Sequence, residues 1–334
     1  MTEKILVIQT AFLGDLILST ALFKKIKMKH ANSTLTVIVN KGTEAILEKN
    51  PNIDRIMAVE KKTTFRNPIL FGKFLLDLKK EKFTICYSPH FSHRSSIISY
   101  FSGAGERIGY KESGFSFLHT KTVHRPLRGI HELEKLNALV GDYNLLKPEI
   151  FLDTGSMGLI EQTLSGVYPY IVIVPSSIWE TKRMPIEKFE ELIDKIIKNT
   201  QFNTVIVGSK ADIALGKYLS DRFREKILDL TGRTSLKELS YVISRAKAVV
   251  SNDSSPIHIA SAFNTPTLAI FGATVPDFGY TPVADLHYIS EVALECRPCG
   301  IHGGKICPEK HFRCMIDQNV DTMFKELIYL TGKY

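Results

Sequence analysis

The chain has 334 residues, of which 44% are hydrophobic and 23% charged, with a net charge of +8 and five cysteines. These values are ordinary for a soluble globular protein, and the length suits two domains of about 150 residues each. They argue against a disulfide scaffold. Because no apolar run reaches the roughly 18–20 residues that cross a bilayer, and the start of the chain does not read as a secretory signal, we expect a cytoplasmic protein.

Short apolar runs alternate with amphipathic segments along the chain. In the first half, the pattern predicts strands at residues 4–9, 34–39, 56–60 and 83–89, and helices at 15–30, 96–103 and 131–143. It restarts after a break at 153–169, with strands at 170–175, 202–208, 248–253 and 266–272, and helices at 185–199, 235–246 and 254–263. Such alternation indicates parallel sheets with helices on both faces, so we expect an α/β protein with two doubly wound units.

The loops that directly follow the strands are the places to look for a site, because open parallel sheets bind ligands beyond the carboxyl ends of their strands. The loop after the first strand, TAFLGD, has a single glycine, and PSSIWETK after residue 174 has none. The chain also lacks G-x-x-x-x-G-K-[ST]. The dinucleotide and P-loop interpretations therefore lose their main support.

The segment PSSIWETKRMP is a candidate phosphate site. It places two hydroxyls, Ser176 and Ser177, and two cations, Lys182 and Arg183, between a strand and the next helix. Free N–H groups at a helix amino terminus attract anions, and lysine adds a point charge to phosphate oxygens. An ordinary polar loop is the alternative.

The segment SNDSSPIHIA is a sharper signal at the next strand-to-helix junction. Asp253, Ser254 and Ser255 lie between a buried strand and a helix whose first turn holds Pro256, and His258 follows about one turn in. Hydroxyls and N–H groups there suit a pyrophosphate, and Asp253 suits sugar hydroxyls. The alternative is that Ser and Asp only cap the helix and that His258 is a satisfied, partly buried histidine.

The ordered segments FLGDLILSTALFKKIK, ERIGY, HELEKLNAL, PSSIWETKRMP, LTGRTSLKELSYVISRAKAVVSNDSSPIHIASAFNTPTLAIFGAT and CRPCG…CPEKHFRCM resemble the ADP-heptose:lipopolysaccharide heptosyltransferases, glycosyltransferase family nine. The cysteine-bearing segment resembles the heptosyltransferase II branch more than the I branch. The resemblance implies a GT-B fold, with two doubly wound parallel-sheet domains facing across a cleft. It places an acceptor-binding domain at 1–163, a nucleotide-sugar donor domain at 164–318, and at 319–334 a helix that returns toward the first domain.

The resemblance also assigns site residues and an activity. It implies an inverting, metal-independent transfer of heptose from ADP-heptose to the inner core of lipopolysaccharide, with no required cofactor and with Asp15 as the general base. Two departures from the family pattern, Ser255 in place of glycine and Met184 in place of tryptophan, weaken the assignment of that particular donor. The implied donor-binding residues are Ser176, Ser177, Lys182, Asp212, Thr234, Asp253, Ser254, Ser255 and His258.

The first half of the chain carries almost all of the excess positive charge. Residues 1–165 hold 23 basic and 16 acidic residues (+7), and the remainder holds 20 and 19 (+1). This suits an acceptor rich in phosphate and carboxylate, with Lys24, Arg94 and Arg107 as candidate contacts, and peripheral attachment at the inner face of the cytoplasmic membrane. A solvated basic face is the alternative. No nucleic-acid-binding motif is present, so we expect no nucleic-acid partner.

Four cysteines follow the spacing C-x2-C-x7-C-x6-C in a loop-like stretch. Four thiolates can close a tetrahedral structural zinc site, so Cys296, Cys299, Cys307 and Cys314 are candidate ligands. Four reduced thiols in a packed loop are the alternative. For the whole chain, the alternatives are a GT-B glycosyltransferase with another nucleotide-sugar donor or glycan acceptor, and a catalytically silent glycan-binding relative.

Overall fold

The computed structural model describes residues 2–332 and divides the chain into two compact units, with the boundary between Phe151 and Leu152. Unit 1 ends and unit 2 begins at this boundary, which lies before the position 163/164 expected from the sequence. None of the helices in residues 2–332 combines the length and the apolar character that a membrane span requires.

Unit 1 contains a parallel sheet of six strands in the order β3-β2-β1-β4-β5-β6. Five residues of β1 and five of β2 are buried, as expected for central strands covered on both faces. The strands are β1 (Lys4–Gln9), β2 (Thr34–Asn40), β3 (Arg55–Val59), β4 (Ile85–Ser88), β5 (Glu106–Tyr110) and β6 (Lys121–Val123).

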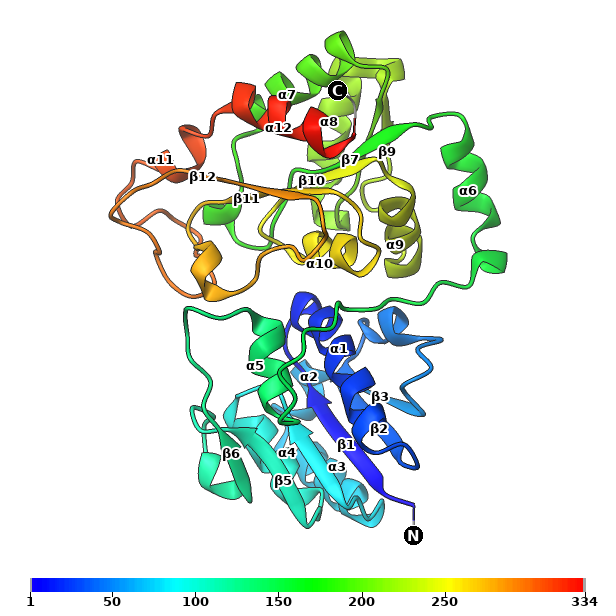
Figure 1. Cartoon of the computed structure of the whole chain (residues 1–334), viewed down its shortest axis with the longest axis vertical. Coiled ribbons are helices and arrows are strands. Elements are labelled where there is room, and N and C mark those ends of the chain that lie inside the picture. The colour runs from blue at the N-terminus through cyan, green and yellow to red at the C-terminus, as the bar shows by residue number, and fades with distance from the viewer. Residues whose placement is uncertain (1, 333–334) are drawn as a thin grey trace. The chain divides into compact units, whose positions relative to one another are not determined.

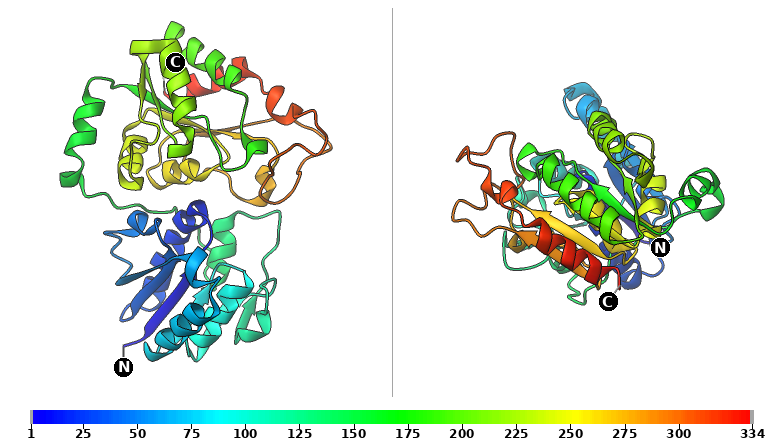
Figure 2. Two further views of the ribbon diagram at one scale, coloured as in Figure 1. Left: turned by 180° about the vertical axis from the view of Figure 1, so that it is seen from behind. Right: turned by 90° about the horizontal axis from the view of Figure 1, so that it is seen from above.

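Helices cover both faces of this sheet (Figures 1 and 2). Helix α1 packs with α5, whereas α3 and α4 enclose an apolar core with Leu6 and Ile8 of β1. The α-helices are α1 (Leu13–Lys29), α2 (Lys61–Thr64), α3 (Pro68–Lys80), α4 (His93–Phe101) and α5 (Glu132–Ala138); two 3-10 turns are η1 (Glu44–Leu47) and η2 (Ser116–Leu118).

Unit 2 repeats the architecture with a parallel sheet in the order β12-β11-β10-β7-β8-β9. All residues of β7, β10 and β11 are buried. The strands are β7 (Tyr170–Val174), β8 (Asn203–Ile206), β9 (Ile227–Asp229), β10 (Ala248–Asn252), β11 (Thr267–Phe271) and β12 (His287–Glu291).

The helices of unit 2 lie above and below this sheet in Figure 1, with α7 and α12 on one face and α9 and α10 on the other. They are α6 (Gly158–Ser165), α7 (Ile186–Asn199), α8 (Ile213–Phe223), α9 (Leu236–Arg245), α10 (Ser255–Ala262), α11 (Arg313–Ile316) and α12 (Val320–Leu330). The 3-10 turns are η3 (Thr154–Ser156), η4 (Glu180–Lys182), η5 (Lys210–Asp212), η6 (Arg224–Lys226) and η7 (Pro276–Phe278).

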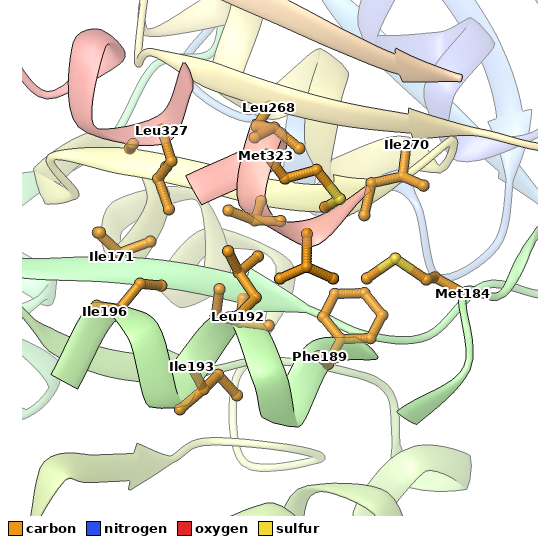
Figure 3. Close-up of a cluster of buried hydrophobic side chains, with 14 of the residues drawn as sticks. Ile171, Met184, Phe189, Leu192, Ile193, Ile196, Leu268, Ile270, Met323 and Leu327 are labelled. Atoms are coloured by element: carbon orange, nitrogen blue, oxygen red, sulfur yellow. The ribbon is translucent and has the colours of Figure 1, made fainter. Parts of the chain in front are cut away.

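The main core of unit 2 lies between the sheet and the pair α7 and α12. Figure 3 shows Phe189 and Leu192 of α7 pointing toward Met323 of α12 and Ile270 of β11. Helix α12, which we expected to return toward the first domain, packs against α7, β11 and β12 and so buries its apolar face within unit 2.

The fold class expected from the sequence is confirmed, although several elements escaped the pattern. The expected break at 153–169 contains η3 and α6, because Ile160 and Leu164, four residues apart, are buried on one face of a helical turn. Two of the edge strands, β6 and β9, are only three residues long and too short for a periodic signal.

Candidate functional site

In each sheet, the chain reverses its direction of winding between two central strands. The reversal falls between β1 and β4 in unit 1, and between β7 and β10 in unit 2. Loops that leave the carboxyl ends of such neighbouring strands in opposite directions open a crevice where ligands bind. The two sites described below occupy these two positions.

In unit 2, the loop after β7 and the loop after β10 are joined by an ion pair. Lys182 Nζ donates to Asp253 Oδ2 at 2.6 Å, with 12% and 8% of the two side chains exposed. Thr274, which follows β11, donates its hydroxyl to the same Asp253 oxygen at 2.6 Å. Three loops at the carboxyl edge of the sheet therefore converge on one carboxylate.

A buried asparagine holds the lysine-bearing loop against β10. Asn252 Nδ2 donates to the carbonyl of Pro175 at 2.9 Å, and its Oδ1 accepts from the N–H of Met184 at 3.1 Å. Both ends of the loop are thus fixed by one side chain. Within the loop, Ser176 and Ser177 are each 8% exposed, so both residues are largely buried.

The cysteine-bearing segment, residues 296–314, packs on the loop that carries Lys182. Thr181 and Gly304 exchange three hydrogen bonds: the N–H and hydroxyl of Thr181 donate to the carbonyl of Gly304 at 3.1 Å each, and the N–H of Gly304 donates to Thr181 Oγ1 at 2.7 Å. Trp179 stacks on His302 with an interplanar angle of 8°. At Gly303 (φ +85°), a Cβ would lie 3.2 Å from Lys182 Cγ, so this glycine allows the segment to approach the lysine closely.

Helix α10 begins at the same edge, as the sequence predicts. Ser254 precedes its first residue, Ser255, and donates its hydroxyl to the carbonyl of Asn252 at 3.1 Å. His258 is 4% exposed and meets Tyr280 edge-on, with ring centroids 6.2 Å apart. The first turn of α10 therefore presents its amino terminus beside Asp253, where a helix favours an anion.

Two further residues predicted to bind the sugar donor, Asp212 and Thr234, follow strands β8 and β9, beyond β7 in the strand order. Asp212, after β8, accepts from the N–H and the hydroxyl of Ser209 at 2.8 and 2.6 Å and so closes a capping box. Thr234 lies after β9, directly before Ser235, which caps α9. These residues follow strands on the β9 side of β7, whereas Asp253 follows a strand on the other side. The capping role of Asp212 is a structural reason for an acid at that position.

In unit 1, Asp15 lies in the first turn of α1. We expected the helix to begin at Asp15, but it begins at Leu13, with Phe12 at the N-cap position and no side-chain cap. Asp15 is therefore not the capping residue. Its half-buried carboxylate lies near the amino end of the helix, where the dipole stabilises negative charge.

Basic side chains follow several strands at the carboxyl edge of this sheet. Lys61, after β3, donates to the carbonyl of Thr10 at 2.8 Å. Burial, together with the charge of Arg94, lowers the pKa of Lys61. His90, after β4, has its pKa lowered to about 4 by burial and by the charges of Lys61 and Arg125. Arg125 in turn pairs with the buried Glu132 at 2.6 Å. Lys61 and Arg125 therefore lie close enough to His90 to disfavour its charged form.

The three predicted acceptor cations differ in their surroundings. Arg94 is exposed and lies near Lys61. Lys24 pairs with Glu149 within the same unit. Arg107 donates to the carbonyls of Ala104 and Leu118 at 2.7 and 2.9 Å, so its guanidinium ties backbone segments together.

The predicted zinc site is not supported. Residues 2–332 contain no group of three or more His, Cys, Asp or Glu side chains placed to hold a metal ion. Cys296, Cys299, Cys307 and Cys314 are free thiols, and burial raises the pKa of Cys314 to about 11. The described segment fits the alternative of reduced thiols in a packed loop, with Thr181 and Trp179 as its contacts.

The profile of glycosyltransferase family 9 (heptosyltransferase) matches residues 72–309, more than half of the chain. The chain belongs to glycosyltransferase family 9. A relative from Salmonella typhimurium, lipopolysaccharide heptosyltransferase 2, is 23% identical over 304 residues, which cover 82% of this chain and 84% of the relative.

Solved structures of family 9 proteins share the fold. The ADP-heptose lipopolysaccharide heptosyltransferase II of Escherichia coli superimposes with a TM-score of 0.81 at 22% identity, covering 99% of both chains. A family 9 glycosyltransferase from Veillonella parvula gives a TM-score of 0.87 at 20% identity, covering 99% of this chain and 98% of that one. These likenesses support the GT-B architecture.

The two departures of this family 9 chain from the expected pattern have structural explanations. Met184 is 3% exposed and belongs to the core that Figure 3 shows, packing near Phe189 and Ile270. Ser255 is the first residue of α10, a helical position that does not require glycine. Both residues therefore fit the local fold of unit 2.

Sequence reasoning missed four residues that the family 9 fold brings to these edges: Asn252, Thr274, Lys61 and His90. Thr274 and His90 lie in FGATVPD and SPHFSHR, loops that directly follow strands and so carried a positional signal. Asn252 is the last residue of a buried strand, where a polar side chain needs a partner. Lys61 carried no signal beyond its place after a strand.

Proposed function

We propose that this protein transfers heptose from ADP-heptose to the anionic inner core of lipopolysaccharide, with inversion at the anomeric carbon. The observation that carries the proposal is the convergence of Lys182, Asp253 and Thr274 at the switch point of unit 2, in a chain that belongs to the heptosyltransferase family. The names of the Salmonella and Escherichia coli relatives support the substrate class.

Unit 2 is the proposed donor site. Lys182, the hydroxyls of Ser176 and Ser177 and the amino terminus of α10 would bind the diphosphate, since cations and helix amino termini stabilise phosphate charge. Asp253 orients Lys182 and offers acceptors for sugar hydroxyls. Asp212 and Thr234 are proposed on the nucleoside side, because their loops follow strands away from the diphosphate.

The proposed chemistry is a direct displacement. The acceptor hydroxyl oxygen bonds to the anomeric carbon as the bond from that carbon to the diphosphate oxygen breaks, and Asp15 takes the hydroxyl proton. A base must approach its proton within roughly 2.6–3.2 Å between heavy atoms in the reacting complex. Lys182 and the helix dipole offset the charge that develops on the leaving ADP, which is the role another enzyme can give to a metal ion.

Unit 1 is the proposed acceptor site. Arg94, with Lys61 beside it, is the cation pair best placed for a phosphate or carboxylate, because two neighbouring like charges are stabilised by an anion. Lys24 and Arg107 already have partners within the unit, so we propose that they contribute less to acceptor binding than Arg94. Such an acceptor would place the enzyme peripherally at the inner face of the cytoplasmic membrane.

The decisive experiment is a transfer assay with ADP-L-glycero-D-manno-heptose and defined core acceptors, with the product analysed by mass and linkage. A product heavier by one heptose supports the proposal. Transfer only from UDP-sugars or other ADP-sugars would favour a different glycosyltransferase. Saccharide binding without release of ADP from any donor would favour a catalytically silent relative.

A further inference from the structure

The turn that carries the chain from β1 into α1 is bound by side chains at, or shortly after, the ends of other strands. Lys61 Nζ donates to the carbonyl of Thr10 at 2.8 Å. Asn40, the last residue of β2, donates through Nδ2 to the carbonyls of Thr10 and Ala11 at 2.9 Å each. Two consecutive carbonyls, four and five residues before Asp15, are therefore bound by protein groups.

His90, which lies two residues after β4, binds the same turn. Its Nδ1 lies 2.9 Å from Thr10 Oγ1 and 3.1 Å from Ser95 Oγ. Thr10 is 1% exposed, so this contact is sheltered from water. With a pKa lowered to about 4, the ring is neutral near pH 7 and one nitrogen can accept from a hydroxyl.

A second set of bonds ties the turn to Asp15 from inside the unit. Gln9 Nε2 donates to Ser19 Oγ at 2.7 Å, and Ser19 Oγ donates to the carbonyl of Asp15 at 2.8 Å. Gln9 Oε1 also accepts from the N–H of Ala11 at 3.3 Å. Gln9 and Ser19 are 3% and 0% exposed. The turn and the backbone of Asp15 are thus linked through one buried pair of side chains.

We propose that Thr10, Asn40 and His90 are positioning residues that fix the Asp15 carboxylate for proton abstraction. A strand-to-helix turn at a sheet edge can leave its carbonyls to water. Here Asn40 of β2 and Lys61, which follows β3, bind two consecutive carbonyls, and His90, which follows β4, contacts the Thr10 hydroxyl. A general base is effective only when its position is held closely. This proposal rests on the proposed role of Asp15 as the base.

The test compares Thr10→Val and Asn40→Ala with the matched control Thr84→Val. Thr84 Oγ1 accepts from Lys4 N and donates to Lys4 O, both at 3.1 Å, and so binds the opposite, amino end of β1. We expect kcat to fall about 10- to 100-fold in Thr10→Val and Asn40→Ala, with KM for the donor within about twofold. Thr84→Val should keep the kcat of the unaltered enzyme, and Thr10→Ser, which retains the hydroxyl, should restore turnover.

The same substitutions in an Asp15→Asn background separate this proposal from the role of Asp15. If Asp15→Asn is inactive and Thr10→Val no longer changes the residual rate, the positioning role is supported. If Asp15→Asn is inactive but Thr10→Val and Asn40→Ala turn over normally, the positioning role is overturned and the base stands. Near-normal turnover in Asp15→Asn would overturn both. Should Asn40→Ala fail to fold, Thr10→Val against Thr10→Ser decides.

Discussion

Lys182 Nζ lies 2.6 Å from Asp253 Oδ2, across 71 positions of sequence, and this ion pair joins the loops at the switch point of unit 2. Asp253 is also bound by Thr274, so the carboxylate is held from two sides. An ammonium has three N–H donors, and the bond to Asp253 uses one of them. Asp253 therefore orients Lys182, and the other two N–H donors of the ammonium are of the kind that binds phosphate oxygens.

The first prediction concerns this lysine. Lys182→Ala should lower kcat/KM about 100- to 1,000-fold and weaken ADP binding, because a charged donor to the leaving group is lost. Steady-state kinetics and ADP calorimetry measure the two effects. Lys217→Ala is the control, since Lys217 pairs with Asp221 on the exposed face of α8. Unchanged kinetics in Lys182→Ala would remove this residue from the site.

The second prediction concerns Asp15. Asp15→Asn keeps the shape of the side chain but removes its basicity, so transfer should be abolished while ADP affinity stays within about twofold, because ADP binding is assigned to unit 2. A radiolabel assay measures the loss of transfer, and calorimetry measures the affinity for ADP. Asp77→Asn, on the surface of α3 where Asp77 pairs with Lys80, should leave transfer unchanged.

The third prediction separates two arginines of unit 1. Arg94→Ala should raise KM for the core acceptor and make KM less sensitive to added salt, because an exposed cation near Lys61 is lost. Arg107→Ala should instead lower the free energy of unfolding by about 1–3 kcal/mol, because two backbone carbonyls lose their donor. Acceptor titrations at two ionic strengths and denaturant unfolding measure these effects. The opposite pattern would reverse the assignments.

The fourth prediction concerns His119, whose ring packs against Gly109 of β5. A Cβ added at Gly109 would lie only 2.6 Å from Cε1 of His119. Burial first, and then the charge of Arg107, lowers the pKa of His119 to about 4. The unfolded chain therefore binds more protons than the folded one between about pH 6.5 and 4, so stability falls as pH falls through this window. His119→Gln should flatten that fall.

Urea unfolding at several pH values between 7 and 4 measures this slope. His90, whose pKa is also lowered to about 4, should maintain part of the acid sensitivity in His119→Gln. If the unaltered protein and His119→Gln lost stability with falling pH at the same rate, His119 would not be a source of the acid sensitivity. Gly109→Ala offers a second check, since the added methyl group must displace the ring and should cost about 1–3 kcal/mol at every pH.

The sequence alone determined the α/β class, the two-unit organisation and the positions of Asp15, Lys182 and Asp253 after buried strands. It could do so because strands covered on both faces form continuous apolar runs, which are visible without any knowledge of neighbours. Residues at the carboxyl ends of such strands must lie at one edge of the sheet. Helix caps such as Ser235 are also local, and the capping box there confirms the expected start of α9.

The tertiary structure alone decided which of these residues meet. Strand order brings β7 beside β10 and β1 beside β4, and so creates the contacts of Lys182 with Asp253 and of Thr10 with His90 across 71 and 80 positions. The spacing of four cysteines suggested a zinc site, but the described residues contain no group placed to hold a metal ion, and hydrogen bonds to Thr181 hold their segment instead. Side-chain partners depend on strand order and loop path, which local patterns do not encode.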